Sequence, residues 1–304
     1  MNRTGIPYLD FAWNPFGFGC SNRCDGCWAR RLAPRVGKNT CPPGARLRAA
    51  GRQGGRRVGC PDCAAFRPHF HAERLDQPAR RRKPAAIGVQ FTGELFDPGQ
   101  PDERIREVLD AAREAGIHDY VFLTQQIERA AACMRWYWGA FGGFWHLGAT
   151  VRDQPEADEA VPKLLAARGP IRSRWVSIEP IRGPVDLGYT FTRAYRRAGG
   201  RAVLDGVIVG SDNRPARRFS LAWVRQIVAA CRAAKVPVFV KQLILPRCDE
   251  CRTVAEPPAA AGEPCPDCRV GRLRLACVTN PAKFPPDLRI RELPWTLTTK
   301  GPNA

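Results

Sequence analysis

Three cysteines near the N-terminus, Cys20, Cys24 and Cys27, lie within eight residues in the stretch WNPFGFGCSNRCDGCWARRL. A structural zinc ion takes four protein ligands, whereas three thiolates leave one position of a metal site open. Iron–sulfur clusters are also held by thiolates, and a cubane bound by three cysteines has one iron free for another group. The spacing predicts a catalytic metal centre. A zinc site completed by a distant cysteine or histidine is the alternative.

Four more cysteines near the C-terminus follow the spacing C-x2-C-x13-C-x2-C. Two such pairs suit a tetrahedral zinc ion, because each pair spans one edge of the coordination sphere. We therefore expect a structural zinc ribbon whose ligands are Cys248, Cys251, Cys265 and Cys268. An auxiliary iron–sulfur cluster is the alternative, since four cysteines do not distinguish the two metals by spacing alone.

A third group, Cys41, Cys60 and Cys63, lies in a basic segment, and its CPDC tetrapeptide recurs in the C-terminal set. The recurrence predicts a second zinc site. Such a site needs a fourth ligand, for which the candidates are His69, His71 and Cys277. The alternative is a partly ordered insertion with free thiols.

The cysteine content also indicates a cellular compartment. The chain has 13 cysteines in 304 residues, no signal peptide before them and no apolar run long enough to span a membrane. Clustered cysteine pairs in a reducing compartment are typical of metal ligands rather than of disulfides. We therefore expect a cytoplasmic protein with no membrane partner.

The positive charge is concentrated in one region. The whole chain carries a net charge of +19, and residues 28–84 contain 15 basic and three acidic residues, a net of +12. Such a block is typical of a surface that binds a polyanion, either nucleic acid or a phosphorylated substrate. The alternative is a solvated surface in a chain rich in arginine throughout.

Short apolar runs alternate with stretches of helical periodicity. The runs lie at residues 8–13, 87–91, 120–124, 144–151, 174–180, 204–210 and 236–242. Residues 102–116 and 221–235 show apolar residues at helical spacing between such runs. This alternation predicts an α/β fold with a parallel sheet. Seven strands suit a full or partial barrel, and an open doubly wound sheet is the alternative.

Polar residues recur where these predicted strands end, which is where parallel α/β folds place their chemistry. They are Thr92, Glu94, Thr124, Gln125, Thr150, Arg152, Glu179, Ser211, Asp212, Lys241 and Gln242. The three N-terminal cysteines follow the first predicted strand. We therefore expect them at the same edge of the sheet as these polar residues.

The spacing of Cys20, Cys24 and Cys27 resembles the C-x3-C-x2-C motif of the radical S-adenosylmethionine superfamily. More narrowly, the chain resembles a phage-associated family of radical-SAM-like proteins, in order along residues 8–243. The matching stretches are WNPFGFGCSNRCDGCWA, FHAERLDQP, KPAAIGVQFTGELF, LTQQIER, HLGATV, SIEPIRGPVDL, DGVIVG and VPVFVKQ.

The resemblance implies a [4Fe-4S] cluster on these three cysteines, with S-adenosylmethionine chelated by the fourth iron, in a full or partial parallel (β/α) barrel. It makes Thr92, Gly93 and Glu94 candidate contacts to the methionine amino group. Gly26 stands where the superfamily has an aromatic residue, and Trp28 follows the last cysteine. Further cofactor contacts implied are Trp28, Thr124 and Thr150, and the implied active-site wall is Glu179, Lys241 and Gln242.

On this interpretation residues 1–244 form the barrel, with a basic insertion at about 38–70. Residues 245–280 form the zinc-ribbon-like module and 281–304 a C-terminal tail. The predicted function is cleavage of S-adenosylmethionine to a 5′-deoxyadenosyl radical, with an electron donor such as flavodoxin or ferredoxin. A nucleic acid or nucleotide is the expected substrate, with phosphate contacts from Arg56, Arg57, Arg80, Arg81 and Arg82. Because the basic segment directly follows the three cysteines in the sequence, we expect it to lie beside them at the mouth of the active site. The alternative function is a non-catalytic zinc-knuckle protein that binds nucleic acid.

Overall fold

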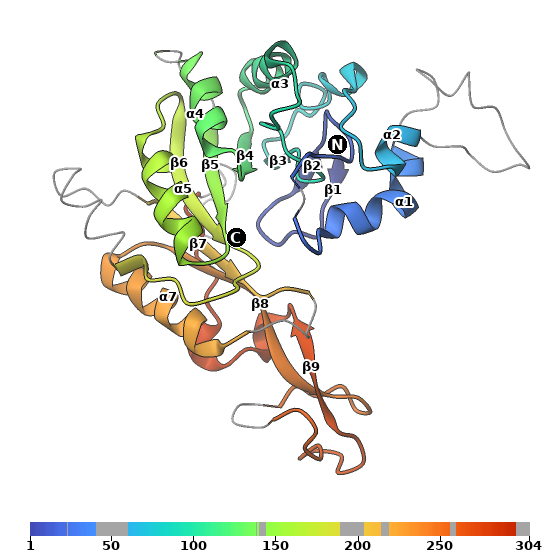
Figure 1. The fold of residues 1–304 in the computed structure, drawn as a ribbon, viewed down its shortest axis with the longest axis vertical. Helices are drawn as coiled ribbons and strands as arrows, with labels where there is room; N and C mark the ends of the chain where they lie inside the picture. The colour runs from blue at the N-terminus through green and yellow to red at the C-terminus, as the bar shows by residue number, and fades with distance from the viewer. Residues whose placement is uncertain are drawn as a thin grey trace, which may run out of the picture. The chain divides into compact units, whose positions relative to one another are not determined.

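The computed structural model describes residues 1–22, 24–40, 60–137, 139, 144–188, 204–213, 219–255 and 260–295. Figure 1 shows α-helices and β-strands that alternate along the chain. The chain forms two compact units. The first is built from described residues of 1–147 and 167–172, and the second from those of 148–166 and 173–296.

The first unit contains a small, mainly parallel sheet. β2 pairs antiparallel with β1 and parallel with β3, and β3 pairs parallel with β4. The strands are β1 (Asn2–Arg3), β2 (Phe11–Trp13), β3 (Ala86–Val89) and β4 (Asp119–Thr124). The helices are α1 (Trp28–Thr40), α2 (Pro61–Ala64), η1 (Ala72–Arg74), α3 (Asp102–Glu114) and α4 (Ile127–Arg135).

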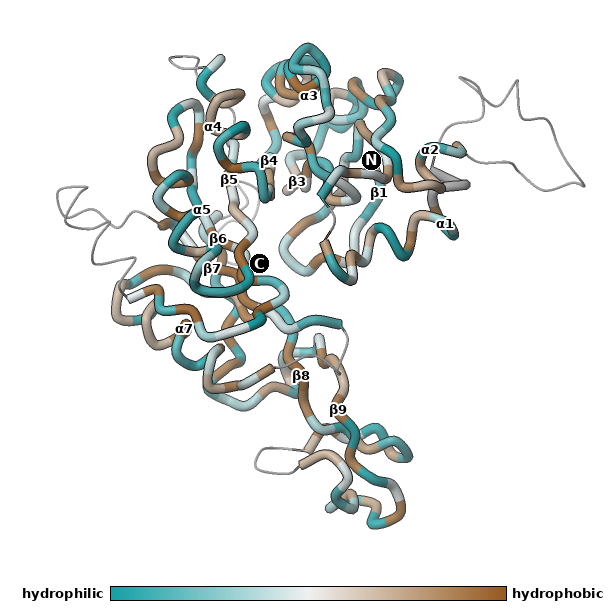
Figure 2. The backbone as a smooth tube through the Cα atoms, in the orientation of Figure 1, coloured by the Kyte–Doolittle hydropathy of each residue, from teal (hydrophilic) through white to brown (hydrophobic). Residues whose placement is uncertain are grey.

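The sequence of α3 explains why this segment forms a helix. Its buried residues are Ile105, Val108, Leu109 and Ala112, which recur every three or four positions and form one apolar face. Acidic residues lie in its first turn and a basic residue in its last turn, which complements the helix dipole. Figure 2 shows the resulting mixture of apolar and polar positions along α3 and α7.

The second unit contains further parallel strands. β6 pairs parallel with β7, and β7 pairs parallel with β8. β5 begins in the first unit and ends in the second. The elements are β5 (Phe144–Val151), α5 (Gln154–Ala166), β6 (Ile171–Ile178), β7 (Gly206–Gly210), α7 (Leu221–Ala234), β8 (Val238–Cys248) and β9 (Leu273–Val278).

The last described residues of the chain pack against this second unit. η2 (Pro281–Lys283) and η3 (Pro286–Leu288) are short 3-10 helices. The amide of Val240 donates to the carbonyl of Ile290 at 3.0 Å. The buried Trp295 ring lies edge-on to Trp175, with 5.3 Å between centroids. These residues therefore contribute to the core of the unit.

The structure confirms the predicted α/β class with its parallel pairing. The first predicted strand is shorter than expected, because Leu9 donates to the carbonyl of Ile6 in a turn and β2 begins at Phe11. β8 is longer than expected. It continues to Cys248 and pairs antiparallel with β9, which the sequence did not predict.

Candidate functional site

The loop that follows β2 is hydrogen-bonded to the residues that follow β3. The carboxamide of Gln90 accepts from the amide of Phe16 at 2.9 Å and donates to the carbonyl of Gly17 at 2.9 Å. The hydroxyl of Thr92 donates to the same Gly17 carbonyl at 2.5 Å. The amide of Ser21 donates to the carboxylate of Asp97. The loop that leads into the three cysteines is thereby held by residues about 75 positions later.

Two glycines permit the close contact between these segments. Gly19 and Gly93 form an isolated parallel bridge, and the amide of Gly19 donates to the carbonyl of Thr92 at 3.3 Å. A Cβ atom at Gly93 would lie 2.1 Å from the carbonyl oxygen of Gly19. Any side chain there would push the two segments apart, so glycine is required by sterics.

The three predicted cluster ligands lie in this loop, directly after the bridge and before α1. Cys20, Cys24 and Cys27 are each partly buried and form no disulfide. The side-chain amide of Gln125 donates to Cys24 Sγ at 3.1 Å, and the amide of Arg30 donates to Cys27 Sγ at 3.5 Å. Burial raises the pKa of Cys20 to about 12, and the neighbouring thiols add to the shift. A bound cation would therefore be needed to keep this thiol ionised.

Glu94 lies beside the three-cysteine loop and is buried. Its carboxylate accepts from the Thr124 hydroxyl at 2.7 Å, the Gln125 amide at 3.0 Å and the Phe96 amide at 3.1 Å. Burial raises the pKa of Glu94 to about 7, although these three hydrogen bonds favour its ionised form. Glu94 and Thr124, two of the predicted cofactor contacts, are therefore joined by a hydrogen bond. Trp28, another predicted cofactor contact, is 44% exposed.

The predicted wall residues lie in the second unit. Lys241 Nζ is 3.0 Å from Glu179 Oε1, and the Ser177 hydroxyl donates to the other Glu179 oxygen at 3.1 Å. Gln242 donates to the Ser211 carbonyl at 2.6 Å. These residues gather where β6, β7 and β8 come together. Thr150, the remaining candidate, is partly buried near the end of β5.

The four C-terminal cysteines come together as predicted. All four Sγ atoms lie within 4.8 Å of one another in Cys248, Cys251, Cys265 and Cys268. Two Sγ–Sγ distances, Cys248 to Cys268 and Cys251 to Cys265, are both 3.7 Å. Two sulfurs on one tetrahedral zinc ion should be about 3.8 Å apart, given Zn–S bonds of about 2.3 Å. The set therefore has the dimensions of a zinc site.

Local hydrogen bonds stabilise the ionised form of some of these thiols, which is the form that binds a cation. The amide of Cys251 donates to Cys248 Sγ and the amide of Gly271 donates to Cys268 Sγ, each at 3.4 Å. Hydrogen bonds with Thr253 lower the pKa of Cys251 to about 6, and amide donors lower the pKa of Cys268. Burial raises the pKa of Cys248 to about 11. Two thiols thus favour the ionised form that a metal ligand requires.

Two residues of the third cysteine group, Cys60 and Cys63, lie within the described residues. Cys41 lies outside the described residues. Ligand atoms of Cys60, His69 and His71 lie within 4.8 Å of one another, so the structure brings the candidate histidines to the CPDC segment. Cys277 lies in the second unit, where its Sγ atom is 3.6 Å from Asn213 Oδ1.

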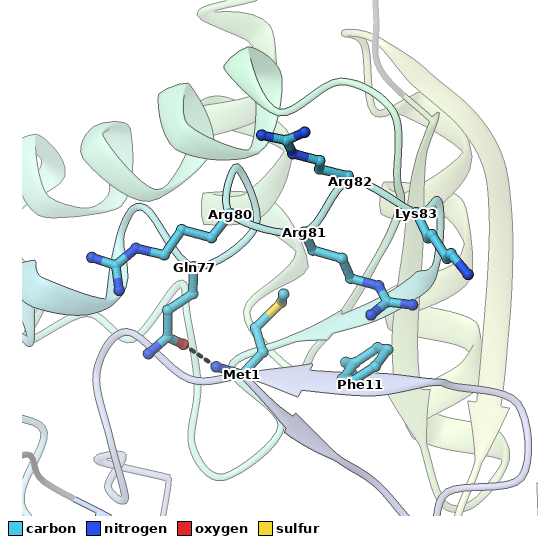
Figure 3. A pocket seen from close by; sticks show the side chains of 7 residues that line it. All are labelled: Met1, Phe11, Gln77, Arg80, Arg81, Arg82 and Lys83. Carbon is cyan, nitrogen blue, oxygen red and sulfur yellow. Dashed lines mark hydrogen bonds between the residues drawn. The ribbon is translucent and has the colours of Figure 1, made fainter.

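Three of the five arginines predicted to contact phosphate, Arg80, Arg81 and Arg82, line a pocket of about 550 Å³ (Figure 3). Its lining residues are Met1, Phe11, Gln77, Arg80, Arg81, Arg82 and Lys83. Arg81 stacks over Phe11, with 4.2 Å from its guanidinium carbon to the ring centroid. Its Nε atom is buried, with no hydrogen-bond partner in the part of the chain that is described.

The sequence placed this basic segment beside the three-cysteine loop, and for residues 80–83 that prediction was wrong. Phe11 begins β2 and residues 80–83 lead into the start of β3, whereas the three cysteines follow the end of β2. The pocket and the cysteines thus lie at opposite ends of the same parallel strands. Arg56 and Arg57 lie outside the described residues.

Several residues of the site were not predicted. Gln90, Asp97 and Gln125 each hold the cysteine loop through a side-chain hydrogen bond. Gln125 was noted only as a polar strand end. Gln90 directly follows β3 and has a positive φ of 57°. This backbone conformation cannot be read from the apolar run in the sequence that predicted the strand.

Residues 3–253 match the model described as "Protein of unknown function (DUF5131)". The chain belongs to this family. No curated protein and no solved structure matched the chain. Among the helices of the described residues, none combines the length and apolar character needed to cross a membrane.

The four-cysteine set generates a prediction about zinc. Cys251→Ser should lose one zinc equivalent per chain and lower the thermal stability of the C-terminal segment, because metal binding contributes folding free energy directly. Metal analysis and thermal unfolding of the purified chain measure both effects. Cys133→Ser is the control, since Cys133 is buried in α4 away from any ligand set in the described residues. Full zinc retention with unchanged stability in Cys251→Ser would refute the assignment.

Proposed function

We propose that this protein is a radical S-adenosylmethionine enzyme in which Cys20, Cys24 and Cys27 hold a [4Fe-4S] cluster. The observation that carries the proposal is the three-cysteine loop, held after β2 by Gln90 and by the Gly19–Gly93 bridge. The associated fold is a full or partial (β/α) barrel, which accords with the parallel strand pairs of each unit.

The open position of a three-thiolate site supports a cluster over a structural zinc ion. A structural zinc ion takes four protein ligands, whereas a cubane bound by three cysteines has one iron free for another group.

In the proposed enzyme, the chain orients the cofactor and the cluster supplies the difficult chemistry. The cluster, reduced by a donor such as flavodoxin or ferredoxin, would provide the electron that cleaves S-adenosylmethionine to a 5′-deoxyadenosyl radical. Glu94 is suited to accept a hydrogen bond from the cofactor's ammonium group, and Thr124 orients its carboxylate. Glu179 and Lys241 form a charged pair suited to binding a substrate.

The cluster assignment is tested by iron analysis. Substitution of Cys20, Cys24 and Cys27 by Ala should remove iron and sulfide from anaerobically prepared protein, because the cluster loses all its protein ligands. Cys133→Ala is the matched control and should keep both. If the triple variant retained the iron content of the wild-type chain, the proposed function would be excluded.

A nucleic acid or nucleotide is the proposed substrate class, and a non-catalytic nucleic-acid-binding protein is the second candidate function. The observation that favours a polyanion is the pocket lined by Arg80, Arg81, Arg82 and Lys83. Because this pocket and the cysteines lie at opposite strand ends, a polyanion there would be bound away from the proposed cluster.

Binding of DNA and RNA oligonucleotides across a salt series tests this pocket. Changing Arg80, Arg81 and Arg82 to Gln should reduce the slope of log affinity against log salt by about 2–3, because fewer counterions are released. The matched control changes three exposed arginines elsewhere, Arg104, Arg113 and Arg225, with the same loss of charge. Equal slopes for the two variants, or no binding at low salt, would show that the pocket is not a phosphate site.

A further inference from the structure

Two cysteines and two histidines gather around α2 and the start of η1, in the spacing C-x2-C-x5-H-x-H. Ligand atoms of Cys60, His69 and His71 lie within 4.8 Å of one another. Cys63 Sγ is 3.5 Å from His71 Nε2. A sulfur and a nitrogen on one tetrahedral zinc ion should be about 3.6 Å apart, given bonds of about 2.3 and 2.0–2.1 Å. Ligand atoms of three of the four side chains thus converge on one point, and Cys63, which lies outside that group of three, contacts His71.

His71 is oriented as a metal ligand would be. Its Nδ1 atom is 2.9 Å from Glu73 Oε1, while Nε2 faces Cys63. A ligating histidine ordinarily donates its second ring N–H to a carboxylate or carbonyl, which fixes the tautomer and aims the other nitrogen at the metal. His71 is buried, so this arrangement is sheltered from solvent.

The cysteine pair repeats the local geometry of the C-terminal zinc set. The amide of Cys63 donates to Cys60 Sγ at 3.5 Å, just as the amide of Cys251 donates to Cys248 Sγ at 3.4 Å. In each site a glycine also lies against a ligand sulfur. A Cβ atom would lie 2.5 Å from Cys63 Sγ at Gly17 and 2.5 Å from Cys248 Sγ at Gly271.

We propose that Cys60, Cys63, His69 and His71 bind a structural zinc ion that fastens the three-cysteine loop. The amide of His69 donates to the carbonyl of Phe16 at 3.3 Å, and the amide of His71 donates to the carbonyl of Pro15 at 2.8 Å. Cys63 also belongs to an apolar cluster with Phe18, against which Cys20, Cys27 and Cys60 pack. Ligands of this ion are therefore bonded to the segment that carries Cys20.

Both the softness of the ligand atoms and the distances between them favour zinc at this site. Thiolate and imidazole ligands together suit Zn²⁺, whereas Mg²⁺ and Ca²⁺ require oxygen ligands. A two-iron cluster with two cysteine and two histidine ligands would divide them between two metal ions. Here one ligand atom from each of Cys60, His69 and His71 converges within 4.8 Å, which suits a single ion.

Metal analysis of the full chain tests the proposal. His71→Ala should lose one zinc equivalent relative to the wild-type chain, and His71→Cys should retain it, because a thiolate can replace the imidazole. Cys41→Ser and Cys277→Ser are the matched controls and should keep the wild-type zinc content. Unchanged zinc in His71→Ala would overturn the proposal, and loss of zinc in Cys41→Ser would overturn this ligand set.

A second measurement applies if His71→Ala does not fold. In a Cys248→Ser/Cys251→Ser variant, which removes the C-terminal site, Co²⁺ in place of zinc should give the absorption of a tetrahedral ion with two sulfur and two nitrogen ligands. No tetrahedral Co²⁺ spectrum would overturn the proposal. Zinc content is read separately from iron content, so failure of the cluster assignment and failure of this site are distinguishable.

The fastening role has its own readout in hydrogen exchange. In the Cys248→Ser/Cys251→Ser variant, which lacks the C-terminal site, zinc removal by a chelator should accelerate exchange of the His69 and His71 amides, which donate to the cysteine loop, at least tenfold. Amides of α7 in the second unit serve as the internal control and should not change. Equal protection of His69 and His71 with and without zinc would contradict the role in fastening the loop.

Discussion

The arrangement of the first unit depends on contact between two loop segments that lie far apart in the sequence. Gln90 satisfies both an amide and a carbonyl of the loop after β2, and the side chain is buried. Leaving a buried backbone group without its partner costs about 1–3 kcal/mol. The Gly19–Gly93 bridge admits no side chain at Gly93, because a Cβ atom would meet the facing carbonyl. These contacts fix the position of the loop from which the three cysteines follow.

The three cysteine sets differ in the surroundings of their thiols. The N-terminal thiols are partly buried, and burial raises the pKa of Cys20 to about 12, so a metal bound there would have to offset the cost of ionising this thiol. The C-terminal thiols receive amide hydrogen bonds that lower the pKa of Cys251 and Cys268. The Cys60 and Cys63 pair supplements its thiols with histidines, one of which is oriented by Glu73. The three sets therefore differ in the burial of their thiols, in the hydrogen bonds that the sulfurs accept and in the presence of histidine.

The sequence was most informative where periodicity and spacing are local. Apolar runs located β5 at residues 144–151 and helical periodicity located α3 and α7, because burial of one face imposes those patterns. Cysteine spacing predicted the C-terminal four-cysteine set, because each pair can span one edge of a metal's coordination sphere. The role of Gln90 could not be predicted, because it depends on a backbone conformation with positive φ and on a partner 74 residues away. The basic pocket was misplaced because sequence proximity to Cys27 does not reveal which strand end a segment approaches.

The central claim is that the three-cysteine loop holds a cluster that cleaves S-adenosylmethionine. The most direct measurement is anaerobic incubation of the iron-loaded chain with S-adenosylmethionine and dithionite, followed by quantification of 5′-deoxyadenosine, alone and with oligonucleotides. The account predicts formation of 5′-deoxyadenosine over time by the wild-type chain and none above background by the variant that lacks Cys20, Cys24 and Cys27. A chain with a demonstrably reduced cluster that forms no 5′-deoxyadenosine under either condition would contradict it.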